Sequence, residues 1–592
     1  MNCLPILLAI SPATSGVLPA PSSSVSERPN VIVMMTDDQG WGDFGFHGHP
    51  VLRTPALDRL ASESVRLDTF YVHPVCTPTR AALMTGRYPQ RTRAFDTWVG
   101  RAMMDPAEVT VAEVLREAGW ATGIFGKWHL GDCYPMRAMD QGFEESLVLR
   151  GGGIGQPADP EGGEGKYTDP VLFHNGIRRE TKGYCTDVYF DAAIDWIEQQ
   201  TKAERPFFVY LPTNAPHGPF KDVPRELYEK YKAMDLSPAF AAVEEGHALP
   251  TEFDADKLAR IFAMIENVDQ NVAKLNAALE DLGVVDNTLV LFLNDNGPNT
   301  RRAVGGMRGM KSHVHEGGVR SPLWARWPAR LVAGVGRNEV AANIDLMPTI
   351  LEACAVPLPD GLAIDGRSLM PLLERTKRMW DERTIVLQAH RGDEGVPYHN
   401  FMLRGARWKL LNATGFGKEL DSVEPEFELY DLLADPLELH DLAAKEPRVL
   451  AELRAAYDRW FESVSTTRTD NWAPPRIVIG APQAPHVTLT RQDWRKQTAS
   501  GWAPNSQGTW HVEVARSGPY RVRVRALPSS EVESVRVICG EEVARADFPA
   551  DTTEVWLEEV VLPLGPHALR FDLLTAEGAI GPYQVELLPP RD

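Results

Sequence analysis

The sequence predicts an α/β protein with a central, mostly parallel sheet, followed by a small α+β subdomain and an extra all-β domain. Between residues 28 and 375, short apolar runs alternate with segments of helical spacing, which is typical of parallel strands buried on both faces. Residues 376–470 contain a few strand-like runs and one amphipathic helix. Residues 474–592 alternate apolar and polar residues around turns, as an antiparallel β-sandwich does.

Four apolar runs of the first domain each end in a polar cluster. The runs are Val31–Met35, Ala121–Phe125, Phe207–Leu211 and Thr288–Leu293. The clusters that follow them are Asp37-Asp38, Lys127-Trp128-His129, Asn214-Ala215-Pro216-His217 and Asp295-Asn296. Because the carboxyl ends of parallel strands meet at one edge of a sheet, we expect these four clusters to form one site.

Helix signals separate the runs. Thr110 and Glu113 have the spacing of a capping box, and Gly119 suits the position after a helix end. Thr54-Pro55 predicts a helix start, and the spacing of apolar residues predicts a long helix near 254–282. Thr77 is expected to cap a helix whose first residue is Pro78, which places Cys76 beside a helix N-terminus.

The two later domains are predicted from shorter patterns. Three strand-like runs, Thr384–Leu387, Phe401–Leu411 and Phe427–Tyr430, precede an amphipathic helix over Pro447–Val464. The last domain is rich in tryptophan, and its aromatic residues either stack on sugar rings, as in a carbohydrate-binding module, or pack the core of the sandwich. These residues are Trp494, Trp502, Trp510 and Trp556.

Composition excludes several classes of protein. The 592 residues include 61 Lys and Arg against 81 Asp and Glu, a formal net charge of −20, and 43% are hydrophobic. This balance excludes disorder and argues against nucleic-acid binding, although a local basic pocket remains compatible with it. The six cysteines are scattered singly without metal-binding spacing, and Cys133 and Cys185 are either a disulfide or two reduced thiols.

Residues 1–27 are predicted to be a signal peptide and linker. An apolar run from Leu4 to Ile10 precedes small, Pro- and Ser-rich residues, but the usual positive charge is absent. A mis-set start or a disordered tail is the alternative. Export would make the protein periplasmic or secreted, and no later segment has the ~20 apolar residues of a membrane span.

The most informative segment is Cys76-Thr77-Pro78-Thr79-Arg80, followed by Leu83-Met84-Thr85-Gly86. An isolated cysteine is usually a small buried hydrophobe, but this string resembles the Cys-x-Pro-x-Arg and Leu-x-Thr-Gly motif of the sulfatase family. The resemblance implies that a formylglycine-generating or anaerobic sulfatase-maturating enzyme oxidises Cys76 to formylglycine (3-oxoalanine), whose hydrate is the nucleophile. Arg80 would steady this nucleophile.

Four oxygen-bearing side chains form a candidate metal site. Asp37, Asp38, Asp295 and Asn296 offer hard ligands, which suit Ca²⁺ or Mg²⁺, although an Asp-Asp pair after a strand is also a common cap or turn. Sulfatases bind one calcium ion through two adjacent acids near the N-terminus and an Asp-Asn pair before glycine. The resemblance therefore implies one Ca²⁺ held by these four residues together with the converted Cys76.

Two lysines and two histidines complete the resemblance. Lys127 and His129 lie in the string Gly-Lys-Trp-His-Leu-Gly, His217 ends Asn-Ala-Pro-His, and Lys311 precedes Glu-Gly-Gly-Val-Arg. Alone, such lysines are usually solvated and such histidines structural. The family implies that both lysines hold sulfate oxygens, that His217 with Lys311 protonates the leaving oxygen, and that His129 assists the hydroxyl that later expels sulfate.

The resemblance covers roughly Pro29 to Val464 and implies an alkaline-phosphatase-like α/β sandwich that hydrolyses sulfuric esters. Probable export and the extra β domain favour a sulfated small molecule or polysaccharide, most simply a sulfated carbohydrate, as substrate. Two alternatives remain open at this point. One is a phosphodiesterase or phosphonate hydrolase of the same superfamily, and the other is a non-catalytic carbohydrate-binding protein.

Overall fold

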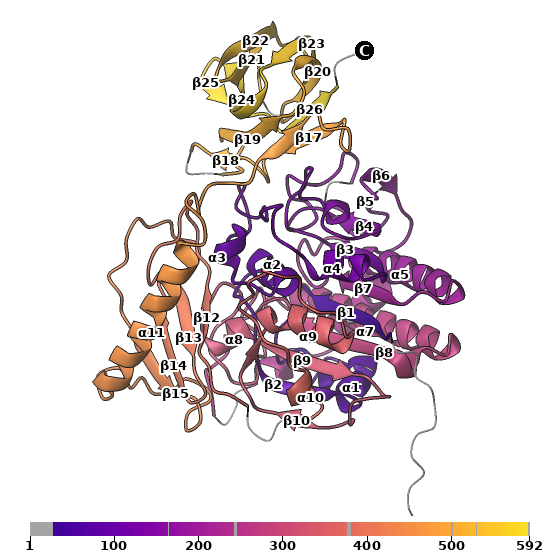
Figure 1. Cartoon of the computed structure of the whole chain (residues 1–592), viewed down its shortest axis with the longest axis vertical. Helices are drawn as coiled ribbons and strands as arrows, with labels where there is room; N and C mark the ends of the chain where they lie inside the picture. Colours follow the sequence, from indigo (N-terminus) through magenta and orange to yellow (C-terminus); the bar gives the residue numbers. More distant parts are fainter. Residues whose placement is uncertain are drawn as a thin grey trace, which may run out of the picture.

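A large mixed sheet organises the first part of the chain (Figure 1). The computed structural model describes residues 28–163, 165–241, 245–375, 380–498, 501–528 and 530–589, and within them this sheet has 11 strands. The five central strands β8, β1, β7, β3 and β4 are parallel, and antiparallel pairs flank them on both sides. From one edge to the other the strands are β10 (Gly336–Arg337), β2 (Val65–Tyr71), β9 (Arg320–Arg326), β8 (Thr288–Asn294), β1 (Asn30–Thr36), β7 (Phe207–Pro212), β3 (Ala121–Lys127), β4 (Glu145–Leu149), β5 (Val171–His174) and β6 (Ile177–Glu180), with β11 (Ala341–Ala342) also pairing with β2.

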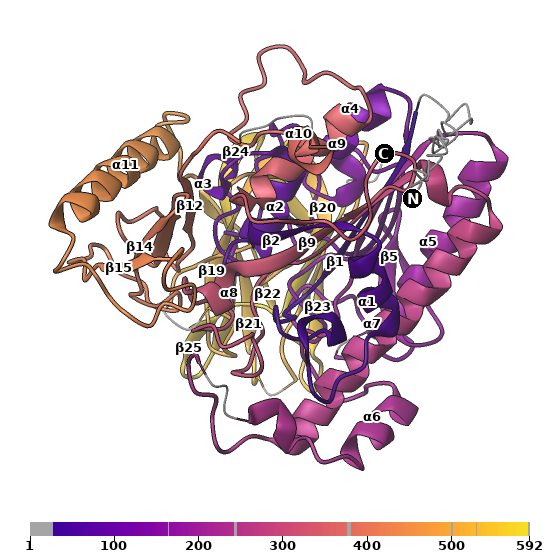
Figure 2. The same ribbon diagram turned by 90° about the horizontal axis from the view of Figure 1, so that it is seen from below.

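Helices cover both faces of this sheet (Figure 2). Successive side chains of β1 point to opposite faces: Val31, Val33 and Met35 pack in one apolar cluster, whereas Ile32 and Met34 pack in another. Burial on both faces is why the strand is a continuous apolar run. The first cluster includes α2 (Cys76–Thr85), α4 (Val111–Glu117), α9 (Leu346–Ala353) and α10 (Met370–Leu373), and the second includes α1 (Pro55–Ser62), α5 (Cys185–Lys202) and α7 (Ala255–Asp281). The remaining helices of this part are α3 (Pro89–Thr92), α6 (Arg225–Lys232) and α8 (Glu316–Val319).

Most helix boundaries follow the predicted signals. Thr110 and Glu113 form the predicted capping box, and Gly119 follows the end of α4 with a left-handed φ of 91°. The predicted start at Pro55 is also confirmed, although the Thr54 hydroxyl donates to the Asp58 carboxylate and does not cap the helix. The long helix near 254–282 is α7, which Asp254 caps.

The predicted start of α2 is wrong by two residues. The helix begins at Cys76, and its N-cap is Val75. Thr77 does not cap because its hydroxyl donates to the backbone carbonyl of His129, 52 residues away, at 3.1 Å. Cys76 therefore lies within the first turn of the helix.

A four-stranded antiparallel sheet with one helix follows the main sheet. The predicted strand over 401–411 is a hairpin of two strands, and one face of this sheet packs against α11 while the other packs against the first part of the chain. The elements are β12 (Ile385–Gln388), β13 (Phe401–Arg404), β14 (Trp408–Asn412), β15 (Glu428–Asp431) and α11 (Pro447–Ser465).

The C-terminal segment forms two further sheets, which lie at one end of the molecule (Figure 1). Their strands pair almost entirely antiparallel, and Trp494 and Trp510 fill the core between them. One sheet contains β16 (Ile477–Ile479), β18 (Arg495–Lys496), β19 (Gly508–Val514), β21 (Ser534–Cys539), β22 (Glu541–Asp547), β24 (Gly565–Thr575) and β25 (Gly578–Ile580), and the other contains β17 (Val487–Thr490), β20 (Gly518–Arg525), β23 (Glu554–Leu562) and β26 (Gln584–Leu588).

Three other expectations concern cysteines, the N-terminus and membranes. Every cysteine in the described residues is free, so Cys133 and Cys185 are two reduced buried thiols. They belong to different apolar clusters, which explains why they do not pair. The predicted signal peptide lies outside the described residues, and among the described helices none is both long and apolar enough to cross a bilayer.

Candidate active site

The predicted site residues converge at one edge of the main sheet. The four strands whose ends carry the polar clusters, β8, β1, β7 and β3, are neighbours in the sheet and parallel. Strand β2 runs in the same direction, because β2 and β8 are both antiparallel to β9. Its carboxyl end leads to Cys76 at the same edge, and Lys311 lies on the connection from β8 to β9.

Cys76 is buried in the wall of a pocket of about 230 Å³ that His129, His217 and Lys311 also line. Burial raises the pKa of the Cys76 thiol, against the opposing effect of Lys127 and Lys311. The side chain is therefore a neutral thiol near pH 7, which is a weak nucleophile. The residue is in the right place for an attack on a ligand but is chemically unsuited to it without modification.

Three buried carboxylates lie beside Cys76, and three cations pair with them. Arg80 donates to Asp37 Oδ2 at 3.3 Å and to Asp295 Oδ2 at 3.0 Å. Lys127 is ion-paired with Asp37, and Lys311 Nζ lies 2.6 Å from Asp38 Oδ1. Burial disfavours the Lys311 ammonium, but the attraction of Asp38 outweighs it and keeps the lysine pKa above its usual range.

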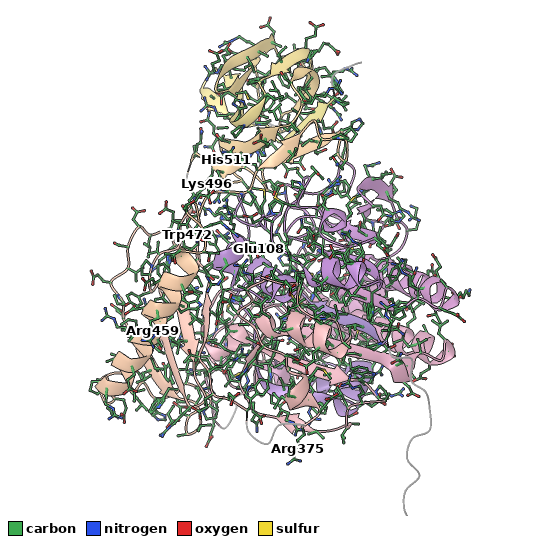
Figure 3. All side chains as sticks on the ribbon, viewed as in Figure 1. Glu108, Arg375, Arg459, Trp472, Lys496 and His511 are labelled. Atoms are coloured by element: carbon green, nitrogen blue, oxygen red, sulfur yellow. The ribbon has the colours of Figure 1, made fainter. Side chains whose placement is uncertain are left out.

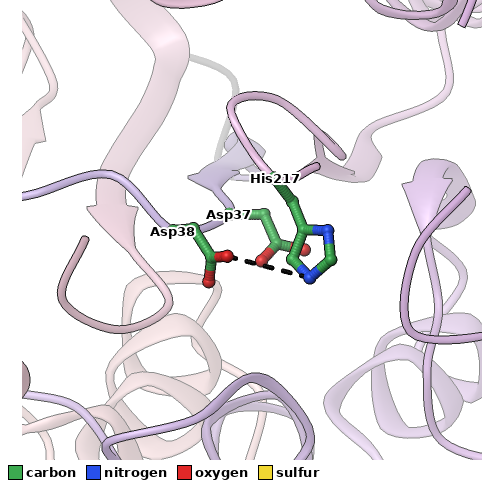
Figure 4. Close-up of side chains that lie close together, drawn as sticks. All are labelled: Asp37, Asp38 and His217. Carbon is green, nitrogen blue, oxygen red and sulfur yellow. Dashed lines mark ion pairs between the residues drawn. The ribbon is translucent and has the colours of Figure 1, made fainter. Parts of the chain in front are cut away.

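The donor atoms of this cluster fit a hard cation. The oxygens of Asp37 and Asp38 lie within 4.8 Å of each other and of a His217 nitrogen (Figure 4). Asp37, Cys76 and Asp295 form a second such group. Asp37 Oδ1 and Asn296 Oδ1 are buried with no hydrogen-bond partner among the described residues. Burial and repulsion from Asp37 raise the pKa of Asp295 to about 7, so its negative charge is incompletely compensated. A divalent cation would satisfy the unpartnered oxygens and this charge.

The two histidines use different ring nitrogens to bind backbone carbonyl groups. His129 Nε2 lies 2.8 Å from the Thr97 carbonyl oxygen, which only accepts, so Nε2 carries the hydrogen. Burial and the nearby Lys127 hold the His129 pKa well below its usual value, so the ring is neutral and Nδ1 has a free lone pair. His217 instead donates from Nδ1 to Gly218 at 2.7 Å and directs Nε2 toward Asp38, 3.7 Å away.

Glycines make room for these side chains. A Cβ atom on Gly126 would lie 2.0 Å from the Pro212 carbonyl oxygen, so the close approach of β3 and β7 that positions Lys127 requires glycine there. A Cβ on Gly152 would approach His129 to 2.7 Å, and one on Gly153 would approach His217 to 2.8 Å. The glycines at 152 and 153 therefore let the backbone pack directly against both histidines.

Several pocket residues were not predicted from the sequence. Trp98 lines the pocket. The unpredicted lining residues are Val75, Thr97, Gly152, Gln156, Ser312, Arg391 and Phe416. Trp502, from the C-terminal segment, also lines the pocket, although the sequence suggested only sugar stacking or core packing for it. A second hollow of about 340 Å³ shares Ser312 and contains Arg301, His313 and His315.

Two protein-family models match this chain. Residues 29–356 match the family model described as sulfatase, which is more than half of the chain, and residues 310–459 match the C-terminal model of N-sulphoglucosamine sulphohydrolase. The chain belongs to the sulfatase family.

Known sulfatases align with most of this chain. Human arylsulfatase A is 32% identical over 478 residues, covering 73% of this chain and 87% of its own length. Canine N-acetylgalactosamine-6-sulfatase is 31% identical over 397 residues, covering 62% and 69% of the two chains. The sulfatase described here is a sulfuric ester hydrolase, and its membership disfavours both the phosphodiesterase and the non-catalytic alternatives.

Solved structures of similar fold cover about three quarters of this sulfatase. The crystal structure of Ps i-CgsB in complex with k-i-k-neocarrahexaose has a TM-score of 0.64 at 24% identity and covers 76% of this chain and 95% of its own. A protein solved with its substrate D-glucosamine-2-N,6-O-disulfate has a TM-score of 0.58 at 23% identity, with coverage of 75% and 99%. These likenesses confirm the predicted alkaline-phosphatase-like α/β fold.

Proposed function

We propose that this protein is an exported, calcium-dependent sulfatase that uses formylglycine made from Cys76 and acts on a sulfated carbohydrate. One observation carries the proposal: Cys76 lies buried in the first turn of α2, in a pocket with Lys311, beside a carboxylate and an amide oxygen that have no hydrogen-bond partner in the described part of the chain. Export and the maturation enzyme follow from the N-terminal pattern and the Cys-x-Pro-x-Arg motif.

The proposed metal ligands are Asp37, Asp38, Asp295, Asn296 and the converted residue 76. When bound, Ca²⁺ supplies positive charge to a sulfate oxygen and to the nucleophile, and the formylglycine supplies a hydroxyl that attacks sulfur. Three carboxylates face three cations in this cluster, so a divalent ion leaves a net charge of about +2 to attract the sulfate.

Lys127 and Lys311 are proposed to bind sulfate oxygens, and Arg80 is proposed to steady the nucleophile. Both ammonium groups are paired with carboxylates of the proposed metal site. When those carboxylates bind a cation, they attract the lysines less, and the ammonium groups become available to sulfate oxygens as charge develops in the transition state. Arg80 is fully buried and donates to the Lys127 carbonyl at 2.8 Å, which suits a fixed support for the ligand set.

The ring tautomers support separate roles for the histidines. His129 has a neutral ring with an acceptor at Nδ1, which suits removal of a proton from the hydroxyl at position 76. His217 has its Nδ1 hydrogen committed to Gly218, so Nε2 is the atom that gives a proton to the leaving oxygen. Burial lowers the pKa of His217, which makes a bound proton easier to give up, and Asp38 partly opposes this shift. Lys311 lines the same pocket and is proposed as a second proton source.

The proposed substrate is a sulfated sugar. Relatives at about 30% identity are named for N-acetylgalactosamine-6-sulfate hydrolysis, and the matched C-terminal model is named for N-sulphoglucosamine. Both names describe sulfated aminosugars. These names favour a saccharide over a simple phenol as the alcohol released.

The proposal is tested by comparing two ester classes. We expect the purified protein to hydrolyse p-nitrophenyl sulfate and sulfated monosaccharides, and to hydrolyse a p-nitrophenyl phosphate diester at least ~10²-fold more slowly by kcat/KM. The diester carries a second organic group where a sulfate ester offers an oxygen to the lysines and the cation. Rates are measured with and without a chelator. Faster cleavage of the phosphate diester would reject the sulfatase proposal in favour of a phosphodiesterase.

Replacement of His217 is expected to affect poor leaving groups most. His217→Ala should lower kcat for a sulfated monosaccharide by about 10²-fold or more, because a sugar alkoxide needs a proton from a general acid. Nitrophenolate leaves without protonation, so kcat for p-nitrophenyl sulfate should fall much less. The two rates are measured on the same preparation.

A matched control and a second variant make this result decisive. His174→Ala removes a histidine of strand β5 that pairs with Glu145 of strand β4, outside the pocket. This variant should leave both rates unchanged. His129→Ala should slow both substrates alike, because its proposed role follows release of the alcohol. If His129→Ala shows the leaving-group dependence and His217→Ala does not, the two roles are reversed.

A further inference from the structure

The C-terminal β segment is fixed to the rest of the protein through a shared core. Val99, Met103, Cys133 and Met136 belong to the same apolar cluster as the buried tryptophans of the two C-terminal sheets. Backbone bonds cross the same boundary: Gly100 donates to Gln492 at 2.8 Å, and Val478 donates to Tyr134 at 3.0 Å. The segment therefore does not behave as a tethered appendage, because separating it would expose part of its own core.

A network of ion pairs holds three parts of the chain together near the pocket. Arg101 donates to Asp393 at 2.7 Å and to Glu419 at 3.1 Å, so it joins the main part to the small subdomain. Arg495 lies 2.8 Å from Asp393 and Lys496 lies 2.6 Å from Glu419, so both acids also bind the C-terminal segment. Figure 3 labels Lys496 at this junction. These pairs restrict the position of β18, the strand that precedes Trp502 in the chain.

The same junction reaches the catalytic histidine. The carbonyl oxygen of Thr97 accepts from His129 Nε2 at 2.8 Å and from Gln492 Nε2 at 3.2 Å. The Thr97 carbonyl group, which sets the His129 tautomer, thus also binds the C-terminal segment. The neighbouring residue, Trp98, is on the pocket wall.

Trp98 and Trp502 form an aromatic corner of the pocket that contains Cys76. Their ring centroids lie 5.4 Å apart at an interplanar angle of 74°, an edge-to-face pair. Gly501 allows this approach, because a Cβ there would lie 2.6 Å from the Trp98 ring. The Trp502 indole donates to the Arg491 carbonyl at 3.0 Å, and the Arg391 guanidinium covers Trp98 at 4.3 Å, so both rings are held in place.

We propose that Trp502 and Trp98 form a subsite for the sugar ring that carries the sulfate ester, so that the C-terminal segment completes the active site and sets its preference for ring-bearing alcohols. The pocket provides cations where the sulfate binds and indole surfaces beside them, which matches an anionic group on an amphipathic ring. Position 502 lies beyond both matched family segments. The inference rests on the proposed function, because it takes the ring from the sulfate ester.

The other tryptophans of the segment are not placed for this role. Trp494 and Trp510 are fully buried in the core of the sheets. Trp556 lies on β23 under the guanidinium of Arg521, 4.2 Å from its ring centroid, and does not line the pocket. It is therefore a suitable control.

Kinetics of three variants test the subsite. Trp502→Ala should raise KM for a sulfated monosaccharide about tenfold, the loss expected for one aromatic contact, and change kcat less than about twofold. Trp502→Phe should retain most of the affinity, and Trp556→Ala should match the wild type. The inhibition constant of inorganic sulfate, which has no ring, should stay constant in all three. An unchanged saccharide KM in Trp502→Ala would overturn the inference, and so would a parallel rise of the sulfate inhibition constant.

A binding measurement separates this inference from the proposed function and does not depend on turnover. In a Cys76→Ala background, a sulfated monosaccharide should change the tryptophan fluorescence, and inorganic sulfate should not. Trp502→Phe should remove most of that change even where Trp502→Ala is too unstable to purify. A wild-type protein that hydrolyses no sulfate ester would refute the proposed function, whereas active wild type with an unaltered fluorescence response in Trp502→Phe would refute only the subsite.

Discussion

Cys76→Ala is expected to lower kcat/KM for p-nitrophenyl sulfate by at least ~10⁴-fold, the scale seen when a covalent nucleophile is removed. Alanine cannot be oxidised to an aldehyde, and no other side chain of the pocket occupies the same place in the first turn of α2. The fold should survive, because a small residue replaces a small residue among polar neighbours. Steady-state kinetics measure the loss of activity. Mass spectrometry of the peptide that contains residue 76, from protein made in its native host, measures whether that residue is oxidised.

The control is another buried cysteine. Cys354 is free and buried at the end of α9, away from the pocket, and Cys354→Ala should keep most of the activity. The wild-type peptide should carry an aldehyde at position 76, detectable also by reaction with a hydrazide. Fully active protein whose Cys76 is unmodified would refute the nucleophile assignment.

Calcium is expected to raise both the activity and the thermal midpoint of the wild type, and Asp37→Asn should abolish both effects. A ligand present at 100 times its dissociation constant stabilises the folded state by about 2.7 kcal/mol. Here the ion would also relieve the repulsion among Asp37, Asp38 and Asp295, all of which are buried. Thermal melts of chelator-treated protein with added Ca²⁺ measure the binding without turnover.

The metal prediction has two internal controls. Asp235→Asn removes an exposed acid, so its calcium response should equal that of the wild type. Zn²⁺ should stabilise less than Ca²⁺, because four of the five proposed ligands offer only hard oxygen atoms. Full activity after complete removal of calcium would eliminate the metal assignment, as would an Asp37→Asn variant that still gains stability from Ca²⁺.

The arrangement of the site along the sheet edge was predictable from local patterns. The runs at 31–35, 121–125, 207–211 and 288–293 are continuously apolar because both faces of these strands are covered by helices. Each polar cluster follows its run directly, and the parallel direction of the strands brings the clusters to one edge. The chain order of motif residues therefore indicated their convergence before any contact was known.

Local signals were insufficient where a distant group competes for the same atom. Thr77 has the side chain of a helix cap, but the carbonyl of His129 takes its hydroxyl hydrogen, and α2 begins two residues earlier than predicted. Likewise, Thr54 precedes a helix without capping it. The Thr77 interaction joins segments that the sequence does not place together, whereas the Thr54 hydroxyl donates to Asp58 only four residues away.

The sequence by itself contains the motif residues of this sulfatase and their order. It also places them at strand ends, because the apolar runs and the polar clusters that follow them depend on neighbouring residues alone. Three other features depend on the packing of distant segments. They are the ionic pairing of Arg80, Lys127 and Lys311, the ring tautomers of His129 and His217, and the place of Trp502 at the pocket. Trp494, Trp502 and Trp510 carry the same indole side chain, so burial of apolar area does not by itself distinguish between them. Only the docking of the C-terminal sheets against residues 97–136 places two of these tryptophans in a core and the third beside Cys76.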